Sequence, residues 1–228
     1  MRKLFRKGDA FRLVGERSRR TEAERETLDK AGADAAFRKG QRELYETVLR
    51  PEGFLRWRGA AFVRRSPEDW LEVIELQKER YGARTFTVNC IVAPIFLPGA
   101  EPDMSFAERL GILAVGRDVW WDFAPDAAEG SFRNVGEAIR RFGLPWFQSQ
   151  RGGGYRETLQ REGDRPWAKR WLAAMDARGK DILAERETIR ENCRRLRLPK
   201  SLLRENERKV GSPQACITPG AIPLTRWR

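Results

Sequence analysis

The residues best suited to specific contacts gather around one predicted turn. Gln77, Lys78, Arg80 and Tyr81 combine hydrogen-bonding groups, positive charges and an aromatic ring within a short stretch. Loops on a rigid sheet often carry binding function, so these residues are a candidate binding surface. The alternative is that Lys78 and Arg80 solvate the turn while Tyr81 packs on its neighbours.

Arg109 and Trp120 extend this candidate surface, because we expect their segments to lie near the turn. Trp120 stands beside Trp121, and adjacent residues of a strand point to opposite faces. If Trp121 faces the core, Trp120 is either covered by a helix or exposed, and exposed Trp is typical of interfaces. Cover by a helix that begins at Ser131 is the alternative to a binding role.

A second candidate surface is a row of arginines near the C-terminal end. It consists of Arg186, Arg190, Arg194 and Arg197, at helical spacing. Such a row neutralises phosphates and predicts salt-sensitive, sequence-tolerant binding of nucleic acid or another polyanion. The alternative is a solvated helix face, because Glu185, Glu187 and Glu191 lie among the arginines and offset their charge.

The sequence shows no recognisable catalytic set. It contains no histidine, which excludes Ser-His and Cys-His nucleophile systems and histidine-based zinc sites. A nuclease that uses a carboxylate and a lysine needs the two residues on one strand face, but Glu75 and Lys78 point to opposite faces. We therefore predict no catalytic residue, no metal site and no cofactor, although an enzyme of unrecognised type stays open.

Three other features are assigned structural roles. We interpret Glu68, Asp69, Glu72 and Glu75 as a solvated strand edge. Cys90 falls on a predicted apolar face, where a free cysteine is usually a packing residue. The glycines at positions 152–154 have neither the lysine nor the preceding strand of a phosphate loop, so we interpret them as a flexible link.

The turn is positioned by a predicted hairpin, Trp70–Val92. Phe86, Val88, Cys90 and Val92 alternate with polar residues, which is typical of a half-buried strand. The strand before the turn is apolar on both faces, which favours a central position in the sheet. Short strands around Phe54–Trp57 and Ala60–Val63 precede the hairpin, and a further strand is expected over Asp118–Phe123.

Helices are predicted on both sides of these strands. Apolar residues at helical spacing indicate helices over Asp34–Leu49 and from Ser131 to Gly143, the second stopped by Gly143 and Pro145. Further helices begin at Pro166 and Asp181. The predicted fold class is α+β: an antiparallel sheet meander packed by helices, with a basic helical C-terminal extension.

Charge divides the 228-residue chain into three parts. Residues 151–228 carry 19 Lys and Arg against 10 Asp and Glu, whereas residues 31–150 carry 16 against 17. We therefore predict a basic, flexible arm over 1–30, an α+β core domain over 31–150, and a basic helical extension with an irregular tail over 151–228. The three cysteines without a CxxC motif favour a reducing compartment, so we expect a cytoplasmic protein without a membrane-spanning segment.

Several short segments in the middle of the chain occur in a recognisable order and spacing. They are Gly53-Phe54, the strand that contains Phe62, the segments 74–82 and 86–89, Arg109-Leu110-Gly111 and Trp120-Trp121. Through these segments, roughly residues 34–150 resemble a bacterial family known only as a domain of unknown function, DUF4304. The resemblance implies an α+β domain and no known activity.

Together these observations favour a bacterial cytosolic protein that acts by binding. The leading hypothesis is a non-catalytic domain that binds a protein partner through the turn and the Trp120 region. The alternative hypothesis is binding of nucleic acid or another polyanion through the basic C-terminal helices.

Overall fold

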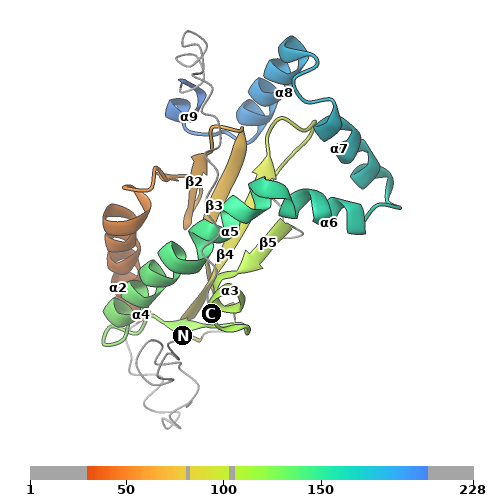
Figure 1. The fold of residues 1–228 in the computed structure, drawn as a ribbon. Coiled ribbons are helices and arrows are strands. Elements are labelled where there is room, and N and C mark those ends of the chain that lie inside the picture. The colour runs from red at the N-terminus through yellow and green to blue at the C-terminus, as the bar shows by residue number, and fades with distance from the viewer. Residues whose placement is uncertain (1–29, 81–82, 103–105, 205–228) are drawn as a thin grey trace, which may run out of the picture.

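The computed structural model describes residues 30–80, 83–102 and 106–204. These residues form one antiparallel sheet with helices packed against it (Figure 1). The strand order is β1-β2-β3-β4-β5, and β6 pairs with β4. The predicted α+β class and the antiparallel meander are confirmed.

The long hairpin β3–β4 is the centre of the sheet. The strands are β1 (Leu55–Arg56), β2 (Ala61–Arg65), β3 (Trp70–Lys78), β4 (Thr85–Pro94), β5 (Ala107–Arg109) and β6 (Trp121–Asp122). β3 and β4 pair antiparallel, with Ile74 opposite Cys90, which confirms the predicted hairpin. Of the strand expected over Asp118–Phe123, only β6 pairs with the sheet, at the turn end of β4.

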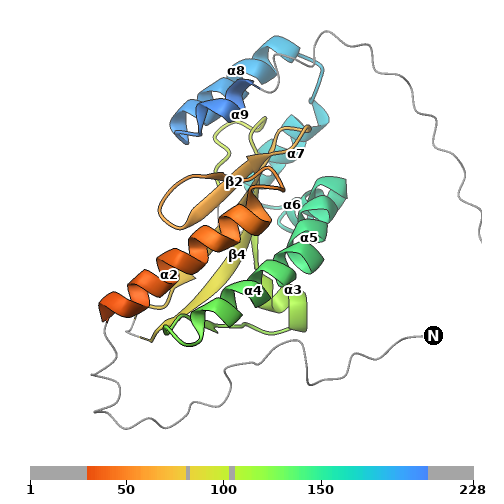
Figure 2. The same ribbon diagram turned by 90° about the vertical axis from the view of Figure 1, so that its left-hand side faces the viewer.

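One helical layer begins with α2 (Lys30–Leu44), which continues into the π-helical turn η1 (Tyr45–Leu49). Beside it lies α4 (Ala128–Ala138) (Figures 1 and 2). The ring of Phe37 contacts the rings of Phe86 and Phe132, with centroids 5.4 and 5.5 Å apart. These aromatic contacts join α2 to β4 and to α4.

The helix predicted to stop at Gly143 and Pro145 instead continues to Arg161, for about five more turns. Its successive parts are η3 (Ile139–Gly143), α5 (Leu144–Ser149), η4 (Gln150–Gly154) and α6 (Tyr155–Arg161). Pro145 is tolerated because it stands in the first turn of α5, where its missing N–H has no partner to lose after the π-helical turn. The predicted flexible link is a helical turn with a kink at Gly153, whose φ is 133°.

The C-terminal helices lie at the upper end of the sheet in Figure 1. They are α7 (Pro166–Asp176), α8 (Ile182–Arg195) and α9 (Lys200–Arg204), and α7 and α8 begin where the sequence predicts. Asn192 Nδ2 of α8 donates to the carbonyl oxygens of Ile95 and Leu97, both at 2.8 Å. These helices therefore pack against the end of the hairpin.

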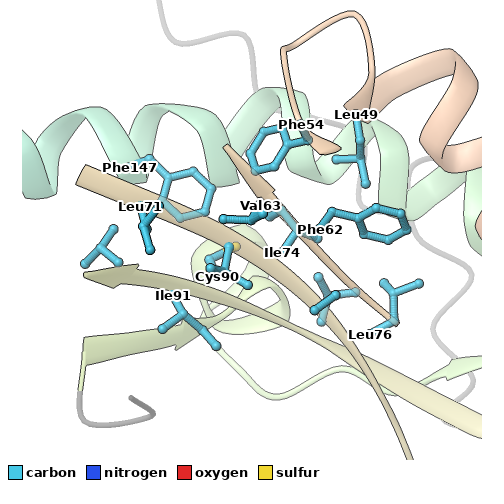
Figure 3. Packing of buried hydrophobic residues seen from close by; sticks show 14 of the residues in the cluster. Leu49, Phe54, Phe62, Val63, Leu71, Ile74, Leu76, Cys90, Ile91 and Phe147 are labelled. Carbon is cyan, nitrogen blue, oxygen red and sulfur yellow. The ribbon is translucent and has the colours of Figure 1, made fainter. Parts of the chain in front are cut away.

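The hydrophobic core joins the sheet to the helices. Figure 3 shows buried side chains from η1, β2, β3, β4 and α5 in one cluster, including Leu49, Phe62, Ile74, Cys90 and Phe147. The core also includes Tyr155 and Leu196, which follow the predicted boundary near residue 150. That boundary stays a prediction, and the predicted arm and irregular tail fall almost wholly outside the described residues.

The segment after β4 contains β5 and the short helix α3 (Leu110–Val115). The sequence pattern of this segment does not distinguish helix from strand, and the structure contains both in succession. None of the helices in the described ranges has the length and apolar composition needed to cross a membrane.

Candidate functional site

The predicted turn surface is divided by the sheet. Gln77 and Lys78 are neighbours on β3, so their side chains leave opposite faces. Lys78 Nζ lies 2.7 Å from Asp34 Oδ1 and 4.2 Å from the ring centroid of Phe37. Lys78 therefore binds α2 and does not share a surface with Gln77.

Gln77 belongs to a polar cluster on the other face of the hairpin. Asn89 Nδ2 donates to Gln77 Oε1 at 3.0 Å and to Glu75 Oε2 at 3.1 Å. Asn89 and the adjacent Thr87 are fully buried. These hydrogen bonds fix the side chain of Gln77 in the sheet.

Arg109 lies directly across from Asn89, on β5. Its guanidinium pairs with the carboxylate of Asp118 and lies 5.3 Å from the ring centroid of Trp120. Trp120 Nε1 also donates to Asp118 Oδ2 at 3.1 Å. The structure therefore brings Arg109 and Trp120 together, with Asp118 as the group that holds both.

Helix α3 begins directly after Arg109 and exposes two apolar side chains. Ile112 is 41% exposed and Val115 is 38% exposed, and their spacing places them on one side of the helix. A Cβ atom added at Gly111 would lie 2.6 Å from the backbone nitrogen of Val119, so α3 lies against the segment that leads to Trp120. We call Arg109, Ile112, Val115, Asp118 and Trp120 the α3 patch.

Trp120 is half-buried. It is therefore neither fully covered by a helix nor fully exposed, which are the two outcomes expected from the sequence. Arg80 is exposed at the end of the hairpin, and Tyr81 lies outside the described residues. Sequence reasoning missed Ile112 and Val115, because a short strand followed by a short helix produces no sustained period. Asp118 was also missed, and the feature of the sequence that points to it is its position two residues before Trp120.

The four arginines of the predicted polyanion surface are all exposed. Arg186, Arg190 and Arg194 share one side of α8, and Arg197 follows the helix with a φ of 51°. Arg190 NH1 lies 3.6 Å from Glu187 Oε2, and both side chains are 64% exposed. The structure thus places a solvated arginine row on α8, far in sequence from the α3 patch.

The acidic residues of β3 do not form the solvated edge that the sequence suggests. Glu72 is fully buried and pairs with the guanidinium groups of Arg64 and Arg151. The cost of burying the carboxylate is offset by these two positive charges, which sequence spacing does not reveal. Within the described ranges, no three His, Cys, Asp or Glu side chains are grouped to hold a metal ion.

Cys90 is fully buried against the helices, and burial raises the pKa of its thiol. A cysteine in this environment stays protonated and is a poor nucleophile. The structure therefore places Cys90 on the apolar side of β4 that the alternation predicts.

The fold and these contacts define an α+β domain with an antiparallel sheet and an exposed patch of mixed apolar and charged residues. Residues 45–149 match the family model described as Domain of unknown function (DUF4304). This match confirms the resemblance seen in the sequence, and it includes the whole α3 patch. No match was found among curated proteins or among solved structures.

Proposed function

We propose that this chain is a non-catalytic interaction domain of the bacterial cytosol that binds a partner protein through the α3 patch. The observation that carries the proposal is the pairing of Arg109 with Trp120 beside the exposed Ile112 and Val115. Trp and Arg are the residue types that most often dominate protein interfaces, and apolar neighbours exclude water around them.

The contacts of Asp118 support this role. By binding both the guanidinium of Arg109 and the indole nitrogen of Trp120, Asp118 fixes both side chains before a partner arrives. Side chains that are already ordered lose less conformational entropy on binding. We infer that the partner presents apolar side chains to Ile112 and Val115 and a hydrogen-bond acceptor to Arg109.

The test compares partner recovery by two double variants of the full chain. Arg109→Ala with Trp120→Ala removes the centre of the α3 patch. Leu183→Ala with Arg190→Ala removes an apolar and a cationic side chain from α8, where they are more exposed, at 78% and 64%. In affinity purification from the source cells, we expect the first variant to recover a specific partner at least about tenfold less well, since a hot-spot residue contributes about 2 kcal/mol or more. Equal recovery by both variants, with unchanged circular dichroism, contradicts the proposal.

The exposed arginine row of α8 favours a second candidate function, binding of nucleic acid or another polyanion. The test replaces Arg186, Arg190, Arg194 and Arg197 with Gln. A matched control replaces four other exposed arginines, Arg38, Arg42, Arg133 and Arg161. If the row binds DNA, only the first variant lowers the salt dependence of affinity, by about one unit of slope for each lost phosphate contact. Equal slopes in both variants contradict this candidate.

A further inference from the structure

A cavity of about 530 Å³ lies on another part of the molecule. It opens between the end of η1, β1, the turn that joins β2 to β3, η4 and α9. Its charged lining residues are Arg50, Glu52, Arg64, Arg65 and Arg151. Four arginines and one glutamate therefore line the cavity, and of these Arg50 pairs with Glu46 and Arg65 pairs with Asp69.

These arginines come from segments that are far apart in the sequence. Arg50 follows η1, Arg64 and Arg65 end β2, and Arg151 lies in η4. Arg50 is thus the residue directly after the π-helical turn η1, and Arg151 lies in η4, where the helix is kinked at Gly153. π-helical turns inside α-helices are uncommon and are often found at functional sites.

The carboxylate of Glu72 pairs with two of these arginines. Its buried carboxylate contacts Arg64 Nε and Arg151 NH1, so each guanidinium has a fixed orientation. Burial lowers the pKa of Arg64 and of Arg151, and the charge of Arg64 lowers the pKa of Arg151 further. Arg64 also lies 3.7 Å from a carboxylate oxygen of Glu52, and Arg151 lies 3.6 Å from one of Glu68. The two guanidinium groups still repel each other across Glu72, and an anion bound between them would relieve this repulsion.

The remaining donors also suit an oxyanion. Within the described residues, no hydrogen bond joins NH2 of Arg64 or NH2 of Arg151 to another group. Ser66 Oγ accepts from the backbone N–H groups of Glu68 and Trp70, at 3.2 and 3.3 Å, and neither bond uses the hydroxyl proton of Ser66. The cavity wall therefore offers planar guanidinium donors and one hydroxyl whose proton neither of these two bonds uses.

We propose that this arginine-lined cavity is a binding site for a small molecule that carries a phosphate or carboxylate group. Arginine is suited to both groups because its planar donors match their oxygen atoms in pairs. The cavity volume lies within the range of about 300–1,000 Å³ that is usual for small-molecule sites, so it accommodates an organic molecule and not only an inorganic ion. This site does not depend on the α3 patch.

The test titrates the full chain with inorganic phosphate and, separately, with citrate, at constant ionic strength in sodium chloride. Calorimetry measures affinity, and hydrogen exchange measures protection of the backbone at Arg64–Pro67 and at Ser201 and Leu202. We expect saturable binding of at least one probe, with increased protection of these segments. Tighter binding of phosphate assigns a phosphorylated ligand, and tighter binding of citrate assigns a carboxylate ligand.

Two variants and one control locate the binding. Arg50→Gln leaves the buried pairs intact, and Arg151→Lys keeps the charge but loses the planar donors. Each should weaken binding about tenfold, the effect of losing one charge-assisted hydrogen bond. Arg133→Gln, on the exposed side of α4, should change nothing. The proposal is overturned if neither probe binds saturably, or if all three variants bind like the unmodified chain.

Discussion

Glu72 is the most deeply buried acidic residue in the part of the chain that the structure describes. Its carboxylate is removed from water and is compensated by Arg64 and Arg151. Removal of one partner from a buried ionic group leaves the other charges uncompensated, which commonly costs about 3–5 kcal/mol.

We therefore predict that Glu72→Ala lowers the free energy of unfolding by about 3–5 kcal/mol in urea denaturation. Glu187→Ala is the matched control, because Glu187 is 64% exposed and its ion pair with Arg190 is a surface pair. The control should change stability by less than about 0.5 kcal/mol. A loss for Glu72→Ala no larger than that of the control would show that the buried carboxylate is not needed.

The buried thiols predict a pH dependence. Burial raises the pKa of Cys90 and of Cys193 above the ordinary value of 9.0. Above about pH 9 the unfolded thiols lose their protons while the folded thiols keep them, so the unfolded state binds fewer protons and stability falls as pH rises.

Urea denaturation at pH 8 and at pH 10 measures this dependence, and the free energy of unfolding should be lower at pH 10. The burial that causes it is measured by alkylation with iodoacetamide at pH 8, analysed peptide by peptide with mass spectrometry. Cys90 and Cys193 should stay unmodified in the native chain and react fully in denaturant. Rapid alkylation of Cys90 in the native chain would contradict the buried position assigned to it.

At the scale of elements, α2 and α4 pack closely against each other. Gly40 stands at this contact, where an added Cβ atom would lie 2.1 Å from Phe132 Cδ2. Gly130 is also in a helix, α4, but a Cβ atom there would meet nothing within 4 Å.

These two glycines predict opposite effects of the same substitution. Gly40→Ala should destabilise by about 1–3 kcal/mol because the added methyl group displaces Phe132. Gly130→Ala should stabilise by up to about 1 kcal/mol because alanine is the better helix former. Thermal unfolding of both variants tests the packing, and a neutral Gly40→Ala would mean that the helices lie farther apart.

The same elements show what the sequence can predict. Alternation located β4, in which one rule repeats over many residues, and apolar residues on both faces located β3. The prediction that β4 is half-buried was wrong, because Thr87 and Asn89 on its other face are also fully buried. The helix predicted from Ser131 was expected to end at Gly143 and Pro145, because both residues disfavour helix interiors. The π-helical turn before Pro145 removes the conflict, and such a turn has no sequence period of its own.

The candidate site was predictable in part for a similar reason. Arg109 and Trp120 were identified by residue type, and the structure does bring them together. Lys78 was assigned to the same surface, but its neighbour Gln77 takes the opposite face and Lys78 binds Asp34 of α2. The arginine-lined cavity could not be predicted, because its lining residues meet only through tertiary packing.

At the scale of the whole molecule, Asn192 joins the C-terminal helices to the sheet. Its amide nitrogen donates to two carbonyl oxygens in the segment after β4, and Asn192 is buried. Loss of a donor to buried acceptors costs about 1–3 kcal/mol.

Asn192→Ala should therefore lower the hydrogen-exchange protection of α8 about tenfold or more, with a smaller effect on β3 and β4. Arg190→Ala, an exposed change on the same helix, is the control and should leave protection unchanged. This experiment also tests the boundary predicted near residue 150. Equal loss of protection in α8 and in the sheet would mean that the two parts unfold as one unit.

The most direct test of the interaction proposal is photo-crosslinking from the α3 patch in the source cells. A photoreactive phenylalanine analogue replaces Ile112 in one chain and Leu183, which is 78% exposed on α8, in another. The proposal predicts one dominant crosslinked protein from position 112, lost when Trp120→Ala is added, and no such product from position 183. The absence of a specific product from position 112, or its persistence with Trp120→Ala, would contradict the proposal that the α3 patch binds a protein partner.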